Sequence, residues 1–361
     1  MVQWYGTASE VPWLYLLSDW IAVMVFVAIV YSIWNGAGLK LHLEVQHSRP
    51  ASGSPIDEVP DVLLRNGPRP APIFEGDGLA IEIGLDTTGA PRGPAWLAGN
   101  IGSTQLAVGT GLVPRDGWRR LEEVGELRRG SVGASSWVIT SSDPLGFFRG
   151  RRKCPDVEVA VVLPRFTSLA RQLQVRELEA SIAAPRAGSG TELFGVREYR
   201  PGDALRRIHW RSSARHGELV VREYEPPGVQ ALGIFCEPAP ASREVADQIA
   251  RLAASEVWDC LRDGGRVVLW APGLEPSLPR ESRSFWALLE WLARYPTEAG
   301  DEIDPPAVSE AVAVTGRAEP RLVEALETAR RRGARVRAWV VGDADLDVDA
   351  PVQHVGEAWP I

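Results

Sequence analysis

Residues 195–226 contain the densest group of side chains that could do chemistry. The segment holds seven arginines and five carboxylates, together with His209 and Trp210. The charged residues are Arg197, Arg200, Arg206, Arg207, Arg211, Arg215, Arg222, Glu198, Asp203, Glu218, Glu223 and Glu225. Arginine and carboxylate groups pair through two parallel hydrogen bonds. We interpret the segment as an internal lattice of ion pairs or as a docking face for an acidic partner, and the two can coexist.

Catalysis by this segment would need a partner for His209. Ser212, Ser213 and Asp203 lie in no nucleophile-elbow or triad context. The sequence also lacks a Walker loop, a G-x-G-x-x-G after a strand and an H-E-x-x-H motif. We therefore expect a structural histidine, no cofactor and a non-enzymatic protein. The alternative is an enzyme acting on cell-envelope components, with acid and base groups from His209 and nearby carboxylates.

Net charge and cysteine spacing argue against two further classes of function, nucleic-acid binding and zinc binding. The formal net charge is −8, which argues against a general nucleic-acid binder. Cys154, Cys236 and Cys260 match no zinc-binding spacing. Cys236 and Cys260 fall in apolar runs, so we expect reduced thiols buried in a core.

An apolar segment near the start of the chain predicts a membrane anchor. Residues 13–34 carry one charge, Asp19, and are long enough to cross a bilayer. Aromatic residues lie toward both ends of the segment, as at the two membrane interfaces. Lys40 and Arg49 follow it, whereas no base precedes it. The positive-inside rule then predicts a single-pass protein of the inner (cytoplasmic) membrane, with its body in the cytoplasm.

Two patterns divide the body. Residues 40–165 contain alternating runs at 39–45, 79–85 and 157–163, which predict a small antiparallel β-sandwich of immunoglobulin-like character. From residue 229 onward, apolar runs at 229–235, 266–270, 311–315 and 334–341 alternate with helical patterns at 245–261, 284–294 and 322–329. This alternation predicts a parallel, doubly wound sheet with helices on both faces. We expect the acidic tail after Val341 to fray.

The segment at 195–226 also carries a resemblance to a known family. Its pattern is similar to the signature of the domain-of-unknown-function family 58. The matching residues are Arg197, Tyr199, Pro201, Gly202, Asp203, Arg206, Ile208, Trp210, Ser213, Ala214, Arg215, Gly217 and Glu223. Residues 142–148 resemble the S-D-P-F-G-L-F element of that family, and residues 162–165 resemble the strand after it.

The resemblance implies a membrane-tethered protein with a β domain and a von Willebrand factor A-like α/β domain. It also implies association with MoxR-type AAA+ ATPases, so a protein partner of that type is the candidate. Members of the family usually have two adjacent membrane helices, whereas this sequence shows one. Asp203, Arg206, Trp210 and Arg215 would then set the shape of the signature connector.

Metal-binding A-domains use D-x-S-x-S after the first strand, because a hard cation needs several oxygen ligands. Here the first strand runs into Cys236-Glu237-Pro238-Ala239-Pro240, and a later strand ends in Thr315-Gly316-Arg317. Glu237, Ser242 and Thr315 alone do not complete a magnesium site. We therefore expect no metal, and a metal-dependent ligand-binding A-domain is the less favoured alternative.

The expected organisation has five parts. They are a transmembrane anchor (1–38), a β-sandwich domain (39–165), a signature connector (166–228), a von Willebrand factor A-like α/β domain (229–345) and an acidic tail (346–361). The expected function is that of a membrane-anchored adaptor or scaffold whose body binds a protein partner.

Overall fold

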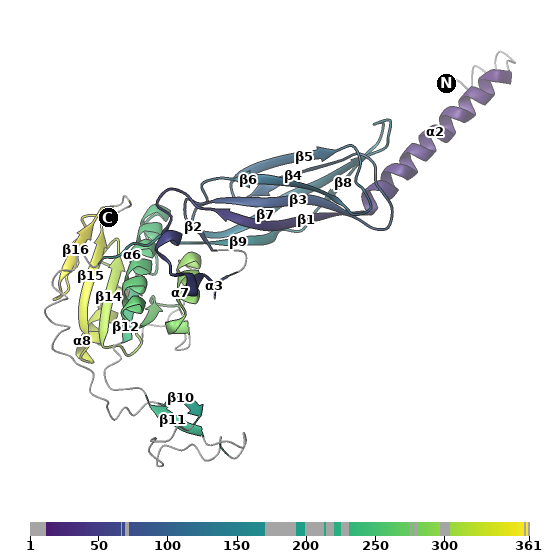
Figure 1. Cartoon of the computed structure of the whole chain (residues 1–361). Helices are drawn as coiled ribbons and strands as arrows, with labels where there is room; N and C mark the ends of the chain where they lie inside the picture. The colour runs from purple at the N-terminus through teal and green to yellow at the C-terminus, as the bar shows by residue number, and fades with distance from the viewer. Residues whose placement is uncertain are drawn as a thin grey trace. The chain divides into compact units, whose positions relative to one another are not determined.

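The chain folds as a mixed α/β protein with an apolar N-terminal helix and several sheets (Figure 1). The computed structural model describes residues 12–65, 67–68, 72–169, 193–198, 213, 220–224, 231–274, 276–277, 281–296, 304–356 and 359. It divides into two compact units, Met1–Arg165 and Phe166–Ile361. Each unit is described by itself.

Helix α2 (Pro12–Ala37) contains the whole apolar segment 13–34 that was predicted to cross the membrane. Within the described part of the chain, it is the one helix that is long and apolar enough to cross a membrane. Most of its large apolar side chains are exposed, as expected for a helix whose surroundings are lipid. Its buried residues lie near its C-terminal end, and they are Ala28, Ser32 and Asn35.

Two β-sheets form the main part of the first unit after α2. The first is antiparallel, with the order β1 (Leu39–Arg49), β3 (Gly78–Thr87), β6 (Trp118–Val124). The second has the order β2 (Ile73–Phe74), β9 (Val157–Leu163), β7 (Gly130–Ser142), β4 (Ala95–Ile101), β5 (Thr104–Thr110). Strand β8 (Arg149–Lys153) pairs with the end of β7. The short helices η1 (Pro55–Glu58) and α3 (Asp61–Arg65) join β1 to β2.

One hydrophobic core holds the two sheets together. Ile81 and Ile83 of β3 pack in the same buried cluster as Leu97 of β4 and Trp137 and Ile139 of β7. Alternation along each strand produces this arrangement, because every second side chain points to the same face. The three strands predicted from alternation are present, and the sandwich joins them to strands whose patterns are weaker. The immunoglobulin-like character remains a prediction.

The second unit contains a five-stranded parallel sheet. Its order is β13 (Arg266–Trp270), β12 (Ala231–Cys236), β14 (Glu310–Thr315), β15 (Arg335–Val341), β16 (Val352–Val355). The helices between the strands are α6 (Arg243–Arg262), α7 (Phe285–Arg294) and α8 (Pro320–Arg331), with the short η3 (Glu281–Arg283) before α7. The prediction of alternating strands and helices in a parallel sheet is confirmed. Likeness to a von Willebrand factor A domain remains a prediction.

Side-chain alternation places the helices on opposite faces of this sheet. Phe235, Ala313 and Val340 pack in a cluster with Leu322 and Leu326 of α8. The neighbouring Arg337 and Trp339 instead contact α6. Ser242 and Ser284 cap α6 and α7, since each side chain accepts a hydrogen bond from a backbone N–H in the first turn.

The acidic tail does not fray as predicted. Strand β16 pairs with β15 in parallel, Ala338 facing Val352 and Val341 facing Val355. Leu346 and Val355 are buried. The apolar residues between the acidic ones supply a sheet edge and a core contact, which outweigh the like charges of exposed carboxylates.

The segment just after the β-sandwich also packs more closely than a connector would. The Phe166 ring lies 5.0 Å from that of Trp258 and 5.4 Å from that of Phe285, measured between centroids. Ser168 Oγ donates to one carboxylate oxygen of Asp259 at 2.8 Å, and the Leu169 N–H donates to the other at 2.7 Å. Residues 166–169 therefore contribute to the core of the α/β unit.

Candidate functional site

The signature segment is described only in part. Strands β10 (Leu193–Glu198) and β11 (Val220–Tyr224) form an antiparallel pair in which Arg197 faces Val221 and Gly195 faces Glu223. Ser213 is buried. The other predicted signature residues lie outside the described residues, and they are Tyr199, Pro201, Gly202, Asp203, Arg206, Ile208, Trp210, Ala214, Arg215 and Gly217. The pairing brings the two ends of the segment together.

The carboxyl edge of the parallel sheet is the place where a fold of this type binds ligands. Strand β12 lies between β13 and β14, so the chain crosses to opposite sides of β12 in successive connections. Ligands of open α/β sheets bind at such a switch point, beyond the carboxyl ends of the strands. At this edge Cys236 ends β12 and Glu237 follows it, and Thr315 ends β14 and is followed by Gly316 and Arg317.

Glu237 is the centre of this edge, and its side chain is 0% exposed. Its Oε2 accepts hydrogen bonds from the Gly316 N–H at 2.8 Å and from Thr315 Oγ1 at 3.1 Å. Its Oε1 accepts one from Arg317 Nε at 2.8 Å. The backbone carbonyl of Glu237 accepts a hydrogen bond from the Tyr295 hydroxyl. The carboxylate is therefore both charge-paired and hydrogen-bonded, as a buried carboxylate must be.

The geometry around Glu237 depends on a glycine. A Cβ added to Gly316 would lie 2.5 Å from Cγ1 of Val245 in α6. Glycine thus lets the β14–α8 turn approach α6 closely enough for its N–H to reach Glu237. Arg317 is fixed from a second side, because its Nη2 donates to the Ala239 carbonyl at 2.7 Å.

These residues do not fit a magnesium ion. Such an ion needs near-octahedral oxygen ligands, whereas the oxygens of the Glu237 carboxylate already have hydrogen-bond partners in Thr315, Gly316 and Arg317. The hydroxyl of Ser242 is used as a helix cap, accepting from the Val245 N–H. Arg317 places a guanidinium cation beside the carboxylate that a metal would need.

A second buried carboxylate joins α6 to the sheet. Glu256 accepts hydrogen bonds from Arg337 Nη1 at 2.5 Å, Arg337 Nη2 at 2.7 Å and Trp339 Nε1 at 2.7 Å. Arg337 Nε also donates to Glu310 at 3.0 Å. Burial acts to lower the pKa of Arg337, but the charges of Glu256 and Glu310 outweigh it and hold that pKa above its usual value. Arg337 therefore stays charged, and the group is a structural bridge.

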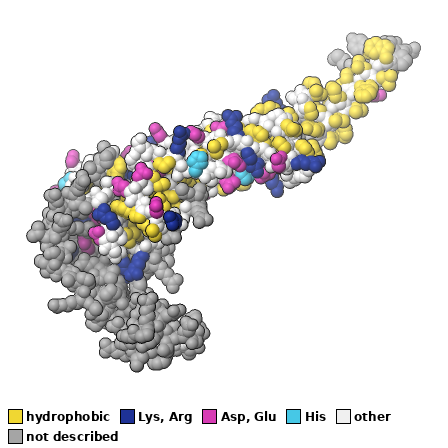
Figure 2. All heavy atoms as spheres, viewed as in Figure 1, with side chains coloured by type: hydrophobic (Ala, Val, Ile, Leu, Met, Phe, Trp, Pro, Cys, Tyr) yellow, Lys and Arg dark blue, Asp and Glu magenta, His cyan; other side chains and the backbone are white. Residues whose placement is uncertain are grey.

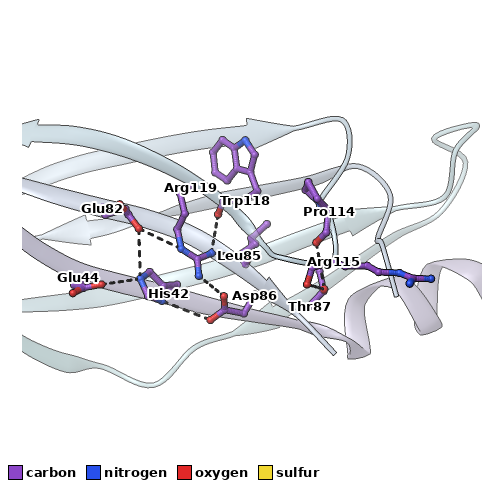
Figure 3. A network of polar contacts seen from close by, with 10 residues as sticks. All are labelled: His42, Glu44, Glu82, Leu85, Asp86, Thr87, Pro114, Arg115, Trp118 and Arg119. Carbon is purple, nitrogen blue, oxygen red and sulfur yellow. Dashed lines mark hydrogen bonds and ion pairs between the residues drawn. The ribbon is translucent and has the colours of Figure 1, made fainter. Parts of the chain in front are cut away.

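A third polar network lies on the β1–β3–β6 sheet (Figure 3). His42 Nε2 is 3.5 Å from Glu44 and 3.8 Å from Glu82, and His42 Nδ1 is 3.6 Å from Asp86. Arg119 lies between Glu82 and Asp86 and pairs with both. Within the described part of the chain, His42, Glu44 and Glu82 are the group whose ligand atoms are close enough to hold a metal ion. Because Arg119 already neutralises Glu82, we interpret the network as ion pairing across strands.

Comparison with known proteins supports a family assignment. Residues 195–272 match the model of a family described as "Protein of unknown function DUF58". The chain resembles the DUF58 family in this region, as the sequence pattern predicted. It is also similar to the "Uncharacterized protein YeaD" of Bacillus subtilis (strain 168), with 22% identity over 242 residues. That similarity covers 63% of this chain and 60% of the relative, so the chain spans less than two thirds of that protein.

Two solved structures were also found. They are complexes of the Amycolatopsis orientalis exo-chitosanase CsxA with PNP-beta-D-glucosamine, at TM-scores of 0.22 and 0.21 and 10% identity. The match covers 87% of this chain and 33% of each of those chains. Overlap at this level carries no argument about fold or chemistry.

The DUF58 match begins in β10 and ends just after β13, so it includes β11, β12 and α6. Glu237 and Glu256 lie within the matched residues, whereas their partners Arg317 and Arg337 lie beyond them. The sequence pointed to Glu237 and Thr315 but not to their pairing with Arg317. Glu256 was not predicted either, and its signal was a carboxylate among the apolar residues of α6.

Proposed function

We propose that this chain is a non-enzymatic, membrane-anchored adaptor whose body binds a protein partner. The candidate partner is a MoxR-type AAA+ ATPase, as the family resemblance implies. Helix α2 would hold the protein in the inner membrane, with the two folded units in the cytoplasm. Lys40 follows the helix, whereas residues 1–12 contain no lysine or arginine, and this difference supports the orientation.

The observation that carries the proposal is the buried carboxylate at the switch point, Glu237, which is held by an ion pair and by hydrogen bonds. A catalytic or metal site at this edge would need a carboxylate with open coordination or a free proton-transfer position. Glu237 instead has its oxygens bonded to Thr315, Gly316 and Arg317. An edge closed in this way favours a fixed surface for recognition over a reaction centre.

The test is capture of the partner by the full chain in lipid nanodiscs. Native membrane and cytosolic extracts are passed over the immobilised protein with Mg·ATP, with ADP or without nucleotide, and bound proteins are identified by mass spectrometry. We expect nucleotide-dependent capture of an AAA+ ATPase, which then binds directly when purified. To test whether a metal bound to the chain itself is needed, one sample of the immobilised protein is treated with EDTA and repurified before use. This treatment should leave capture unchanged.

Variants of the signature segment sharpen the test. Asp203→Ala and Trp210→Ala should abolish capture, whereas Arg330→Ala, which alters an exposed pair with Asp349, should not. Thermal unfolding of each variant shows whether loss of capture is loss of folding. Wild-type capture by both signature variants, or no ATPase bound by the native chain, would contradict the adaptor. Metal-dependent or pH-dependent turnover of an envelope component would favour the enzyme.

A further inference from the structure

The turn between β7 and β8 exposes two large apolar side chains. Leu145 is 60% exposed and Phe147 is 65% exposed. Single exposed apolar residues are common on soluble surfaces and need no explanation. This pair differs because of how the turn is built and where it lies.

Internal hydrogen bonds fix the shape of the turn. The buried Asp143 carboxylate accepts from the Leu145 N–H at 2.9 Å and from the Phe148 N–H at 2.6 Å. The Gly146 N–H donates to the Asp143 carbonyl at 3.0 Å, and Gly146 has a φ of +75°, which favours glycine. Burial acts to raise the pKa of Asp143, but the backbone N–H donors outweigh it and lower that pKa. The exposure of Leu145 and Phe147 is therefore imposed by a formed turn.

The turn runs along α2 toward the N-terminal end of that helix. Asn35 Nδ2 donates to the Ser142 carbonyl at 3.1 Å, and Ser32 Oγ donates to the Phe148 carbonyl at 3.5 Å. Beyond these contacts, a groove of about 680 Å³ lies between α2 and residues Asp143, Pro144 and Leu145. Ala28 is one of the α2 residues that line the groove, and it lies about two helical turns, or about 10 Å, from Asn35 toward the N-terminal end of α2.

A strand rich in basic residues follows the turn. Arg149, Arg151 and Lys153 of β8 are exposed, and they share one face because side chains alternate along a strand. Figure 2 shows lysine and arginine side chains where the β unit meets the yellow, apolar surface of α2. A basic face next to a membrane span complements the negative surface of the cytoplasmic leaflet.

We propose that the β7–β8 turn is a second membrane contact. Leu145 and Phe147 enter the interface of an anionic bilayer beside α2, and Arg149, Arg151 and Lys153 bind lipid phosphate groups. The proposal rests on the anchoring of α2 in the membrane, which is part of the proposed function. With two contacts, the β-sandwich would keep a fixed orientation relative to the bilayer.

The test places a spin label on the full chain in nanodiscs of phosphatidylcholine with or without phosphatidylglycerol. Single cysteines replace Phe147, Met24 or Val62 after Cys154, Cys236 and Cys260 are changed to alanine. Met24 reports on the anchor. Val62 of α3, 70% exposed, is the matched control, because the chain before α3 bonds Asp77 through Ala51 and Ser54, at the opposite end of β3 from α2. Power saturation with oxygen and a water-soluble nickel complex measures the depth of each label.

We expect the label at 147 to be several-fold less accessible to nickel than the label at 62, more so with phosphatidylglycerol. Arg149→Glu with Arg151→Glu should remove the dependence on that lipid. The second contact would be overturned if the label at 147 were as accessible to nickel as the label at 62. If the label at 24 then lay in hydrocarbon, the anchor would stand. A label at 24 in water would overturn both. Dipolar broadening at 147 would indicate a second copy on this face and would also overturn the proposal.

A measurement on the chain without substitutions is also needed, because replacing the three native cysteines could disturb folding. Amide hydrogen exchange at residues 144–147 should be slower in nanodiscs that contain phosphatidylglycerol than in phosphatidylcholine alone. Equal exchange in the two would count against lipid contact.

Discussion

At the residue scale, buried carboxylates are the features that most constrain this protein. Glu237, Glu256 and Asp77 are each fully buried, and each accepts several hydrogen bonds. An unpaired charge in these positions would cost several kcal/mol, so the donors are as necessary as the acids. Asp77, for example, accepts from the Phe74 and Ala51 N–H groups and from Ser54 Oγ. Each carboxylate thus fixes the relative positions of segments of its own unit.

Arg337→Met should be among the most damaging substitutions in the α/β unit. It leaves the Glu256 carboxylate buried without its cation, and breaking a buried pair in this way costs about 3–5 kcal/mol. Urea unfolding of the full chain, followed by tryptophan fluorescence, measures the loss. Arg330→Met removes an exposed pair with Asp349 and should cost at most about 1 kcal/mol. Equal losses in the two variants would show that the Glu256 bridge does not stabilise the fold.

Asp259 should make stability depend on pH. Burial raises the pKa of Asp259 above its usual value, although Ser168 and Leu169 donate hydrogen bonds to it and act to lower that pKa. At pH values between the pKa of Asp259 in the unfolded chain and its pKa in the folded protein, the native state binds more protons than the unfolded state. Protonation of Asp259 therefore stabilises the native state fully below the unfolded pKa, about 3.9. This stabilisation is lost as pH rises through the folded pKa.

The measurement compares wild type with Asp259→Asn by urea unfolding from pH 4 to pH 7. The stability of wild type relative to this variant should fall as pH increases. Asp263→Asn, at an exposed position next to the end of α6, should show no such trend. A flat difference for Asp259 would mean that its carboxylate is as well solvated as in the unfolded chain.

At the element scale, the C-terminal end of α2 is held against the β-sandwich by hydrogen bonds and a cation–π contact. Asn35 donates to the Pro94 and Ser142 carbonyls and accepts from the Gly93 N–H at 2.8 Å. Arg92 lies over the Trp34 ring, 3.6 Å from its centroid, and donates to the Trp34 carbonyl at 2.7 Å. A helix fixed in this way sets the orientation of the sheets relative to its own axis.

Asn35→Ala should loosen this junction. It leaves two carbonyls and one N–H without their side-chain partner, at a cost of about 1–3 kcal/mol for an unsatisfied buried group. Amide exchange of Gly93 in nanodiscs should accelerate by one to two orders of magnitude, following about 1.4 kcal/mol per tenfold change. Ile33→Ala, at a position that is 69% exposed, is the control and should leave Gly93 unchanged. Unchanged exchange in Asn35→Ala would indicate that the helix end moves freely.

At the scale of the whole molecule, the chain combines the apolar helix α2 with two folded units. The first unit carries α2 and the β-sandwich, and the second carries the parallel sheet and the whole DUF58 match. This division suits an adaptor, since one unit can meet the membrane while the other meets a partner.

Reporter fusions at the C-terminus test the orientation. A green fluorescent protein fusion should fluoresce and an alkaline phosphatase fusion should stay inactive, because the first folds in the cytoplasm and the second needs the periplasm. Alkaline carbonate should leave both fusions in the membrane fraction. An active phosphatase fusion would place the body outside, and release by carbonate would argue against a membrane-spanning α2.

The sequence by itself determined the elements that local patterns encode. The apolar run of residues 13–34 predicts α2, alternation at 79–85 predicts β3, and the alternation of runs after residue 229 predicts the parallel sheet. The dense motif at 195–226 also predicted the DUF58 family. These predictions need only neighbouring residues, because helices and strands repeat over a few positions.

The tertiary structure alone decided which distant residues meet. Glu237 pairs with Arg317 across 80 residues, Glu256 with Arg337 across 81, and Asn35 bonds Ser142 across 107. The acidic tail becomes β16 for the same reason, because β15 offers it an unpaired edge. No local period reports such contacts, since they depend on how strands and helices are ordered in space. The hydrogen-bonded edge at Glu237 and the turn beside α2 are both contacts of this kind.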